Sequence, residues 1–208
     1  RCIQAIDYFT ENRDASHVPD SLAREYKTRN GRSVFDGKGI RPDVVIDKPE
    51  LSQIAKALLK QNLIFDFATR FYHDNSEIAA ADQFEISDET WTDFQKFVND
   101  NDFSYKTQSE KMLKALEKAA NEEGYAGGTA AEIRALKAGI AKAKAGDLNL
   151  HKAEIKQLLL EEIVYRYYYD KGRLIASLSH EKEVKEGISL LSNPVDYKKI
   201  LAGGYLVK

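Results

Sequence analysis

The spacing of the apolar residues changes near residue 48, and this change constrains the fold more than any other feature. Before it, short apolar runs alternate with polar stretches that contain glycine or proline, a pattern typical of strands and loops. After it, apolar residues recur every three or four positions almost to the C-terminus, as on one side of an amphipathic helix. We therefore predict a mainly α protein, with a small β region at residues 1–47 and a helical domain at residues 48–208.

Three strand signals lie in the β region. Residues 1–8 form a strand-like run, and since the sequence starts with Arg inside this run, we expect that upstream polypeptide has been removed. Residues 26–28 and 33–35 flank an Asn-Gly dipeptide at 30–31, which tolerates positive φ at both central positions of a type I′ turn. These segments predict a tight hairpin, and residues 44–46 predict a short buried strand.

Caps and apolar stripes mark the predicted helices. Ser87 is expected to cap one helix. Capping boxes at Thr107-x-x-Glu110 and Thr129-x-x-Glu132 predict two more, and the glycines at 124–128 between them indicate an antiparallel pair with a short connection. Apolar stripes and turn residues predict the others at 51–58, 63–72, 150–169 (the longest), 184–191 and 193–203.

Composition excludes several classes of protein. The 31 Lys and Arg nearly balance the 33 Asp and Glu, so a net charge of −2 provides no field that attracts nucleic acid or anionic lipid. No apolar run approaches the roughly 18 residues of a membrane-spanning helix. Cys2 is the single cysteine, which excludes an internal disulfide and a multi-cysteine metal site.

Two serines have a lysine close in sequence. A Ser-Lys protease requires a neutral lysine within hydrogen-bond reach of the serine hydroxyl. Ser52 and Lys56 stand four apart, but an amphipathic helix presents such a pair to solvent, where the lysine stays charged. The run 179–182, Ser-His-Glu-Lys, contains nucleophile, base and acid types, yet neighbours on a helix point in different directions. We expect Ser179 to be an N-cap and neither serine to be catalytic.

The sequence contains no convincing metal-binding pattern. None of the histidines is paired with another His or Cys at zinc spacing, and they are His17, His73, His151 and His180. His73 and Glu77 alone do not define a metal geometry, so we favour a histidine that interacts with a helix C-terminus. Asp100-Asn101-Asp102 begins like a calcium loop, but the glycine and the final glutamate of such a loop are missing. We expect no metal and a polar turn at residues 100–102.

Two further segments contain residue types that occur in ligand sites. Gly37-Lys38-Gly39 lacks the helix that should follow a phosphate loop, because Pro42 and the predicted strand at 44–46 continue in extended form. The tyrosine-rich run 165–169, with Lys171 and Arg173, has residue types that stack on nucleic-acid bases. Since charge is balanced elsewhere, a helix end packed against other helices is the better interpretation. We expect no cofactor and no nucleic-acid partner.

Four segments in order carry a family resemblance: Arg-Cys-Ile-Gln at 1–4, Tyr-Lys-Thr-Arg-Asn-Gly-Arg at 26–32, Asp-Gly-Lys-Gly-Ile-Arg-Pro-Asp at 36–43, and Arg-Tyr-Tyr-Tyr-Asp-Lys-Gly-Arg at 166–173. The first three resemble the end of the catalytic domain in carboxyl-terminal processing proteases, also called tail-specific proteases. The fourth resembles the helical C-terminal region of their Gram-negative bacterial branch. Lys38 departs from the pattern, since relatives usually have another glycine there.

The resemblance implies a structural fragment of a periplasmic or cell-envelope serine endopeptidase that cleaves protein C-terminal tails. In that family an anchor or signal, a PDZ domain and a protease core precede this region, and the core holds the nucleophilic Ser and its Lys base. Residues 1–47 are then a remnant of the catalytic β domain, and no catalytic, cofactor-binding or metal-binding residue is expected in this chain.

Two other expectations concern partners. The helical domain is alternatively a self-sufficient interaction module that binds an adaptor or envelope protein. Homo-oligomers are also expected, either through the helical domain or through the unpaired strand edges at 2–6 and 44–46, because such edges pair with other chains.

Overall fold

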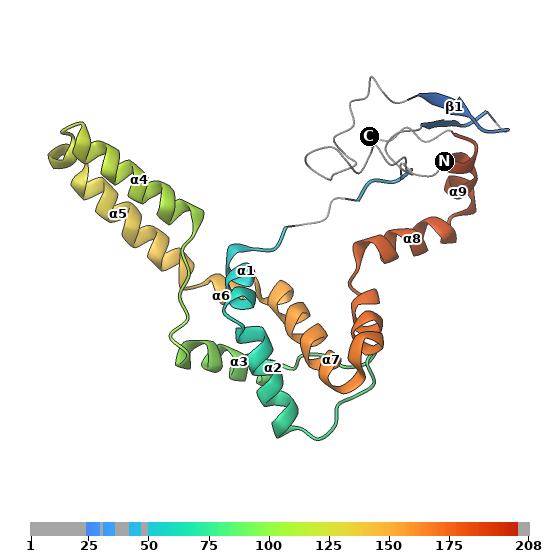
Figure 1. Cartoon of the computed structure of the whole chain (residues 1–208), viewed down its shortest axis with the longest axis horizontal. Coiled ribbons are helices and arrows are strands. Elements are labelled where there is room, and N and C mark those ends of the chain that lie inside the picture. The colour runs from blue at the N-terminus through green and yellow to red at the C-terminus, as the bar shows by residue number, and fades with distance from the viewer. Residues whose placement is uncertain (1–23, 30, 36–41, 47–49, 204–208) are drawn as a thin grey trace. The chain divides into compact units, whose positions relative to one another are not determined.

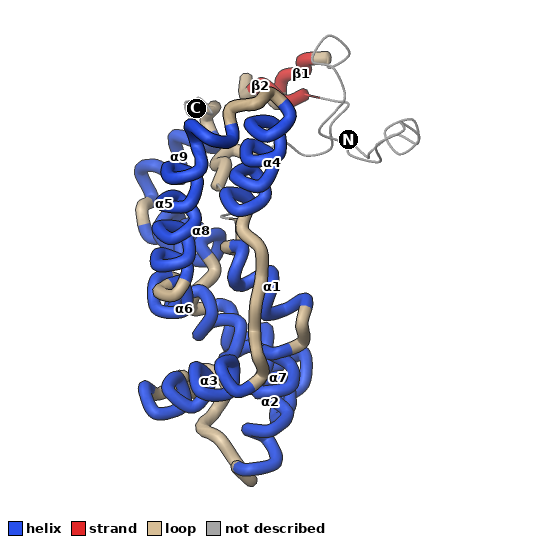
Figure 2. The backbone as a smooth tube through the Cα atoms, turned by 90° about the vertical axis from the view of Figure 1, so that its left-hand side faces the viewer, coloured by secondary structure: helices blue, strands red, loops and turns tan. Residues whose placement is uncertain are grey.

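The chain folds mainly into helices, as the computed structural model shows for residues 24–29, 31–35, 42–46 and 50–203, the residues that the structure describes. Figure 1 labels most of the elements, and Figure 2 shows strand only at β1 and β2. The elements are β1 Glu25–Lys27, β2 Ser33–Phe35, α1 Gln53–Lys60, α2 Leu63–Asp74, α3 Asp88–Asp100, α4 Gln108–Glu122, α5 Ala126–Lys144, α6 Asp147–Leu150, α7 Lys152–Leu178, α8 Lys182–Ser192 and α9 Pro194–Leu201. The predicted mainly α class, with a small N-terminal hairpin, is confirmed.

The chain divides into two compact units. One unit consists of residues 1–48 and 181–208, and the other consists of residues 49–180. The strand predicted at residues 1–8 lies outside the described residues. The division into a catalytic remnant and a helical domain stays a prediction.

The β hairpin forms where it was predicted, but with a different turn. β1 and β2 pair antiparallel with Tyr26 opposite Val34. Thr28 N donates to Arg32 O at 2.9 Å, and Gly31 N donates to Thr28 O at 2.9 Å. Gly31 is therefore the last position of the turn, so the predicted type I′ turn at 30–31 is wrong, although Gly31 does supply a positive φ of 80°.

Residues 44–46 do not form the predicted buried strand. Val45 is 59% exposed, and the sheet within the described residues contains β1 and β2 alone. A short apolar run needs a neighbouring strand to satisfy its backbone groups, and this segment pairs with neither of them. The residue before this segment, Asp43, forms an ion pair with Arg32.

Of the two C-terminal helices, α9 begins at the predicted Asn193-Pro194 and ends close to Gly203, whereas α8 does not begin at Ser179. Asn193 caps α9, since its Oδ1 accepts from Asp196 N at 3.3 Å, and Pro194 occupies the first turn, where a missing N–H costs little. Gly203 follows the helix with a φ of 80°. In α8, Ile188 and Leu191 are exposed.

The core of the second unit forms around α2. This helix packs along α7, and α1 and α3 also contact it. Phe67 lies fully buried with its ring edge-on to Phe94, at 5.1 Å between centroids. The core contains Ile54, Leu58, Leu63, Ile64, Phe67, Ala68, Ile86, Trp91, Phe94, Val98, Ile155, Leu159, Leu160, Ile163, Val164 and Ala176. The apolar stripes predicted at 51–58, 63–72 and after Ser87 are confirmed as buried faces.

Helices α4 and α5 form the predicted antiparallel pair, which we call the hairpin arm (Figure 1). The capping box at Thr107 and Glu110 is present in both directions, with distances of 3.1 and 2.6 Å. The second predicted box is wrong. Gly124, with a φ of 81°, ends α4 so abruptly that α5 starts at Ala126, which leaves Thr129 inside the helix. The buried seam of the arm consists of Leu113, Ala120 and Ile133.

Helix α7 bends sharply at Tyr169, as Figure 1 shows. Tyr169 has a φ of 56° and a ψ of −157°, a conformation that glycine adopts far more readily than tyrosine. The helix was predicted to end at this residue, whereas the chain continues as helix to Leu178 on a new axis. Gly172 makes the bend possible, because a Cβ there would overlap the Cβ of Tyr168.

We predict that Gly172→Ala destabilises the chain by about 1–3 kcal/mol, since the added methyl group overlaps a side-chain root that cannot move away. Urea denaturation followed by circular dichroism measures the change. Gly139→Ala is the matched control: a Cβ at Gly139 meets nothing within 4 Å, so this change should stabilise by about 0.4–1 kcal/mol. Equal effects of the two changes would contradict the packing described here.

Candidate functional site

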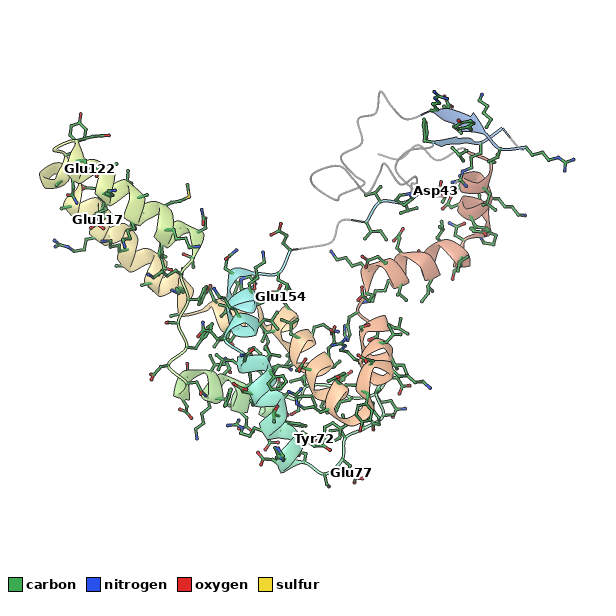
Figure 3. The ribbon with its side chains drawn as sticks, in the orientation of Figure 1. Asp43, Tyr72, Glu77, Glu117, Glu122 and Glu154 are labelled. Atoms are coloured by element: carbon green, nitrogen blue, oxygen red, sulfur yellow. The ribbon has the colours of Figure 1, made fainter. Side chains whose placement is uncertain are left out.

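Ser52 is a structural cap bound to a distant carboxylate. Its Oγ accepts from Ala55 N at 3.2 Å and donates to Glu154 Oε2 at 2.5 Å, while its backbone N–H donates to Glu154 Oε1 at 2.9 Å. Figure 3 shows the labelled Glu154 next to α1. Lys56 turns away and donates to Glu50 Oε2 at 3.0 Å. The serine and the lysine therefore do not meet, and the pair has no Ser-Lys geometry.

The groups around Ser52 do not form a Ser-His-acid triad either. His151 Nδ1 lies 3.8 Å from Glu154 Oε2, so the carboxylate stands between the serine and the histidine. In a triad the histidine stands between them, because it must take the serine proton. The arrangement joins the N-terminus of α1 to the first turn of α7.

Ser179 ends a helix, so the prediction that it is an N-cap is wrong. Helix α7 runs on to Leu178, and Ser179 is its C-terminal cap residue, whose Oγ donates to Ala176 O at 3.3 Å. Glu181 takes the N-cap position of α8, without a side-chain cap bond. The hydroxyl of Ser179 is therefore hydrogen-bonded to the backbone of its own helix.

The remaining predicted ligands are dispersed. His73 lies in the last turn of α2, whereas Glu77 follows the end of that helix, so they share no helix face. Asp102 takes a φ of 50° in the turn after α3, as the predicted polar turn requires. His17 and residues 37–39 lie outside the described residues. Among the residues that are described, no three His, Cys, Asp or Glu side chains gather in a way that suits a metal ion.

The tyrosine-rich run 165–169 fastens α7 to α2 and to the loop that follows it. Arg166 is the main clamp: it donates to Phe65 O at 2.8 Å, to Thr69 Oγ1 at 2.8 Å and to Glu162 Oε1 at 2.9 Å. Tyr167 OH donates to Asn75 O at 2.6 Å. The side chain of Arg166 is only 11% exposed, which leaves its guanidinium engaged with protein groups.

Other tyrosines of this run differ in their exposure. Tyr168 OH lies 3.1 Å from both Ile78 O and Ala79 O, so it also binds the loop after α2. Tyr168 and Tyr169 are 37% and 73% exposed, so the prediction of a helix end buried against other helices holds for Tyr167, which packs against the core, but not for Tyr168 or Tyr169. Phe65 lies under the Arg166 guanidinium, at 4.6 Å from ring centroid to Cζ.

A polar cluster, which we call the latch, fixes the base of the hairpin arm. Tyr105 OH donates to the Asp147 carboxylate of α6, and Lys144 Nζ donates to Tyr105 O and to both oxygens of Glu110 at 3.1 Å. Phe103 stacks on Tyr105 at 5.5 Å, and both rings pack against the core. The latch thereby connects α4, α5 and α6 to the core of the unit.

The latch shifts the ionisation of two of its members. The backbone N–H of Thr107 holds the pKa of Glu110 below its ordinary value of 4.5, and the Lys144 ammonium acts in the same direction. Burial raises the pKa of Tyr105 well above its usual range, and the adjacent Asp147 carboxylate adds to this effect. Glu110 is therefore held as an anion and Tyr105 as a neutral donor, the states that the latch hydrogen bonds require.

The family model for the C-terminal helical domain of probable PDZ-proteases matches residues 54–191, which include the core, the hairpin arm and the clamp. The chain belongs to this family. No curated protein and no solved structure matches the chain. This membership confirms the family that the sequence resembles. The PDZ-protease helical domain is therefore part of a protease, whose substrates are proteins.

Sequence reasoning missed the residues that fix the PDZ-protease helical domain internally. Glu154 binds Ser52 across 102 positions of sequence, and Lys144 binds Glu110 across 34. Neither pair has a local spacing signal, because the partners meet only after the helices pack. Within the described residues, no helix has both the length and the apolar character to cross a membrane.

We predict that Glu110→Gln weakens the acid sensitivity of the domain. The folded-state pKa of Glu110 is lowered, so its contribution to stability is complete above the ordinary value of 4.5 and is lost as pH falls through the lowered pKa. Gln can still accept the cap hydrogen bond but does not titrate. Urea midpoints at neutral pH and below pH 4.5 should differ less for Glu110→Gln than for the unchanged chain.

The control for this comparison is Glu122→Gln, a change at an exposed glutamate on the same helix that accepts no cap hydrogen bond. It should leave the acid sensitivity close to that of the unchanged chain. An equal reduction in both variants would show that the cap and the latch are not the source of the effect.

Proposed function

We propose that this chain is the C-terminal region of a periplasmic tail-specific serine protease, and that its role is to brace the protease rather than to cleave peptides. The Ser nucleophile and the Lys base lie on polypeptide that precedes Arg1 in the whole enzyme. The substrates are the C-terminal tails of proteins. The family membership over residues 54–191 is the observation that carries this proposal.

The geometry of the described residues supports a structural role. The serine with a lysine on its own helix, Ser52, donates its hydroxyl proton to Glu154, and Lys56 is engaged by Glu50. Ser179 donates to a backbone carbonyl. A nucleophile needs a neutral base that accepts its proton, whereas these two hydroxyls donate to a carboxylate and to a backbone carbonyl.

The internal connections suit a brace. Arg166 and Tyr167 tie α7 to α2 with charged and neutral hydrogen bonds, and the latch ties the hairpin arm to the core. Hydrogen bonds to charged groups contribute about 1.5–3 kcal/mol each when their partners are well placed, so these contacts favour a single arrangement of the unit. A rigid unit next to a protease core can hold the substrate-binding side of that core in place.

The test is hydrolysis of an unstructured peptide with an apolar C-terminus by the 208-residue chain. We expect no cleavage above buffer, and we expect Ser52→Ala to reduce stability by about 1 kcal/mol through loss of the cap. Cleavage that is lost in Ser52→Ala or in Ser179→Ala, with folding intact by circular dichroism, would overturn the proposal. Recovery of the whole enzyme, detected with an antibody against this chain, from the cytoplasmic rather than the periplasmic fraction of its source cells would overturn the location.

A further inference from the structure

The backbone of Tyr169 is strained, and the strain lies between two helical segments of α7. Its φ of 56° and ψ of −157° fall close to a region of backbone angles that is essentially restricted to glycine. Residues 152–168 and 170–178 are helical on either side of it, and we call them the first and the second segment of α7. Residues strained in this way persist only where surrounding contacts hold them, and they are typical of switch regions.

Two contacts exist only while α7 is bent. A Cβ built on Gly172 would lie 3.3 Å from Val164 Cγ1, and the Cζ atom of Arg173 lies 5.2 Å from the centroid of the Tyr165 ring. The members of each pair are eight residues apart, which corresponds to about 12 Å of rise in a continuous helix. A continuous α7 would therefore separate both pairs.

The second segment buries little apolar surface in the bent form. Gly172 and Ala176 are its buried residues, and Ala176 adds a single methyl group to the core. Its two leucines, Leu174 and Leu178, are 62% and 44% exposed. Because the hydrophobic contribution is proportional to the apolar area removed from water, the packing of this segment stabilises the bend only weakly.

A continuous helix would gain what the bend gives up. In such a helix the N–H groups of residues 169–172 donate to the carbonyl groups of residues 165–168, and the non-helical angles at Tyr169 interrupt this series. The strain at Tyr169 would also disappear, since the residue would take ordinary helical angles. Strain and interrupted hydrogen bonds on one side thus oppose a few contacts on the other, which brings the two forms close in free energy.

We propose that Tyr169 is a hinge at which α7 exchanges between the bent form and a continuous helix. Tyr168 OH lies 3.1 Å from Ile78 O, so the first segment stays attached to the loop after α2 in both forms. The second segment ends at Leu178, next to the boundary between the two compact units at residues 180 and 181. The exchange therefore changes the direction in which the chain leaves the second unit.

The test is the distance between two spin labels in the 208-residue chain, measured by pulsed electron paramagnetic resonance. The labels are attached at Ala153→Cys and Leu178→Cys, two exposed positions, and Cys2→Ser removes the native thiol. A continuous helix sets the two Cα atoms about 38 Å apart, from 25 residues at about 1.5 Å of rise each, and the bend shortens this distance. We expect two populations, one of them at the longer distance.

Substitution of the strained residue should move the populations. Tyr169→Gly should favour the bent form by at least about fivefold, because glycine adopts a positive φ without strain. Tyr169→Ala is the matched control, since it removes the same ring but keeps the Cβ that disfavours a positive φ. It should not favour the bent form.

Two other substitutions should move the populations in the opposite direction. Gly172→Ala should favour the continuous helix by at least about fivefold, because the added methyl group overlaps the Cβ of Tyr168 in the bent form. Arg173→Ala should favour it by about two- to fivefold, since the contact with Tyr165 exists only in the bent form. Arg173 is 47% exposed, so this variant keeps its fold even where Gly172→Ala does not, and circular dichroism checks both.

Three outcomes would overturn the proposal. A short distance that neither Gly172→Ala nor Arg173→Ala lengthens shows that the bend is fixed. A single distance of about 38 Å in the unchanged chain and in every variant shows that the bent form is not populated. Equal populations in Tyr169→Gly and Tyr169→Ala show that the backbone angles of residue 169 do not control the exchange.

Discussion

The packing of α2 along α7 is the interaction on which the second unit depends. It buries Phe67, Ile64 and Ala68 against Ile155, Leu159 and Ile163, and the other helices of the core attach to this pair. Arg166 adds a polar contact in the same place, with hydrogen bonds to Phe65 O and Thr69 Oγ1. Hydrophobic burial supplies most of the stability, whereas the arginine fixes the position of one helix along the other.

The residue types of a hydrolase occur here in structural roles. The hydroxyl of Ser52 caps α1 and the carboxylate of Glu154 binds the same serine, so both groups serve to join two helices. Ser179 closes the end of α7. A buried or half-buried hydroxyl needs partners whatever its chemistry, and spacing in sequence does not reveal which partner it takes. The geometry decides, and here it places the hydroxyls of Ser52 and Ser179 at helix ends.

Local sequence patterns predicted the local structure well. They failed where the backbone angles of one residue, or a partner far away in the sequence, determine the structure. The stripe of Ile64, Phe67 and Ala68 repeats at helical spacing, so its burial could be predicted. The spacing from Thr129 to Glu132 matches a capping box, yet Gly124 ends the preceding helix early, and α5 has already begun. The bend at Tyr169 depends on the backbone angles of one residue, and the latch depends on contacts between segments far apart in sequence; no periodicity contains either.

The abrupt turn at Gly124 has a consequence for how such domains can diverge. The arm closes on itself at its tip, and the latch lies at its base, so the tip is remote from the residues that hold the arm to the core. Inserting or deleting whole heptads in step on both helices would preserve the seam and leave the latch unchanged. Relatives of different length are therefore expected to vary at the tip of this arm before they vary anywhere in the core.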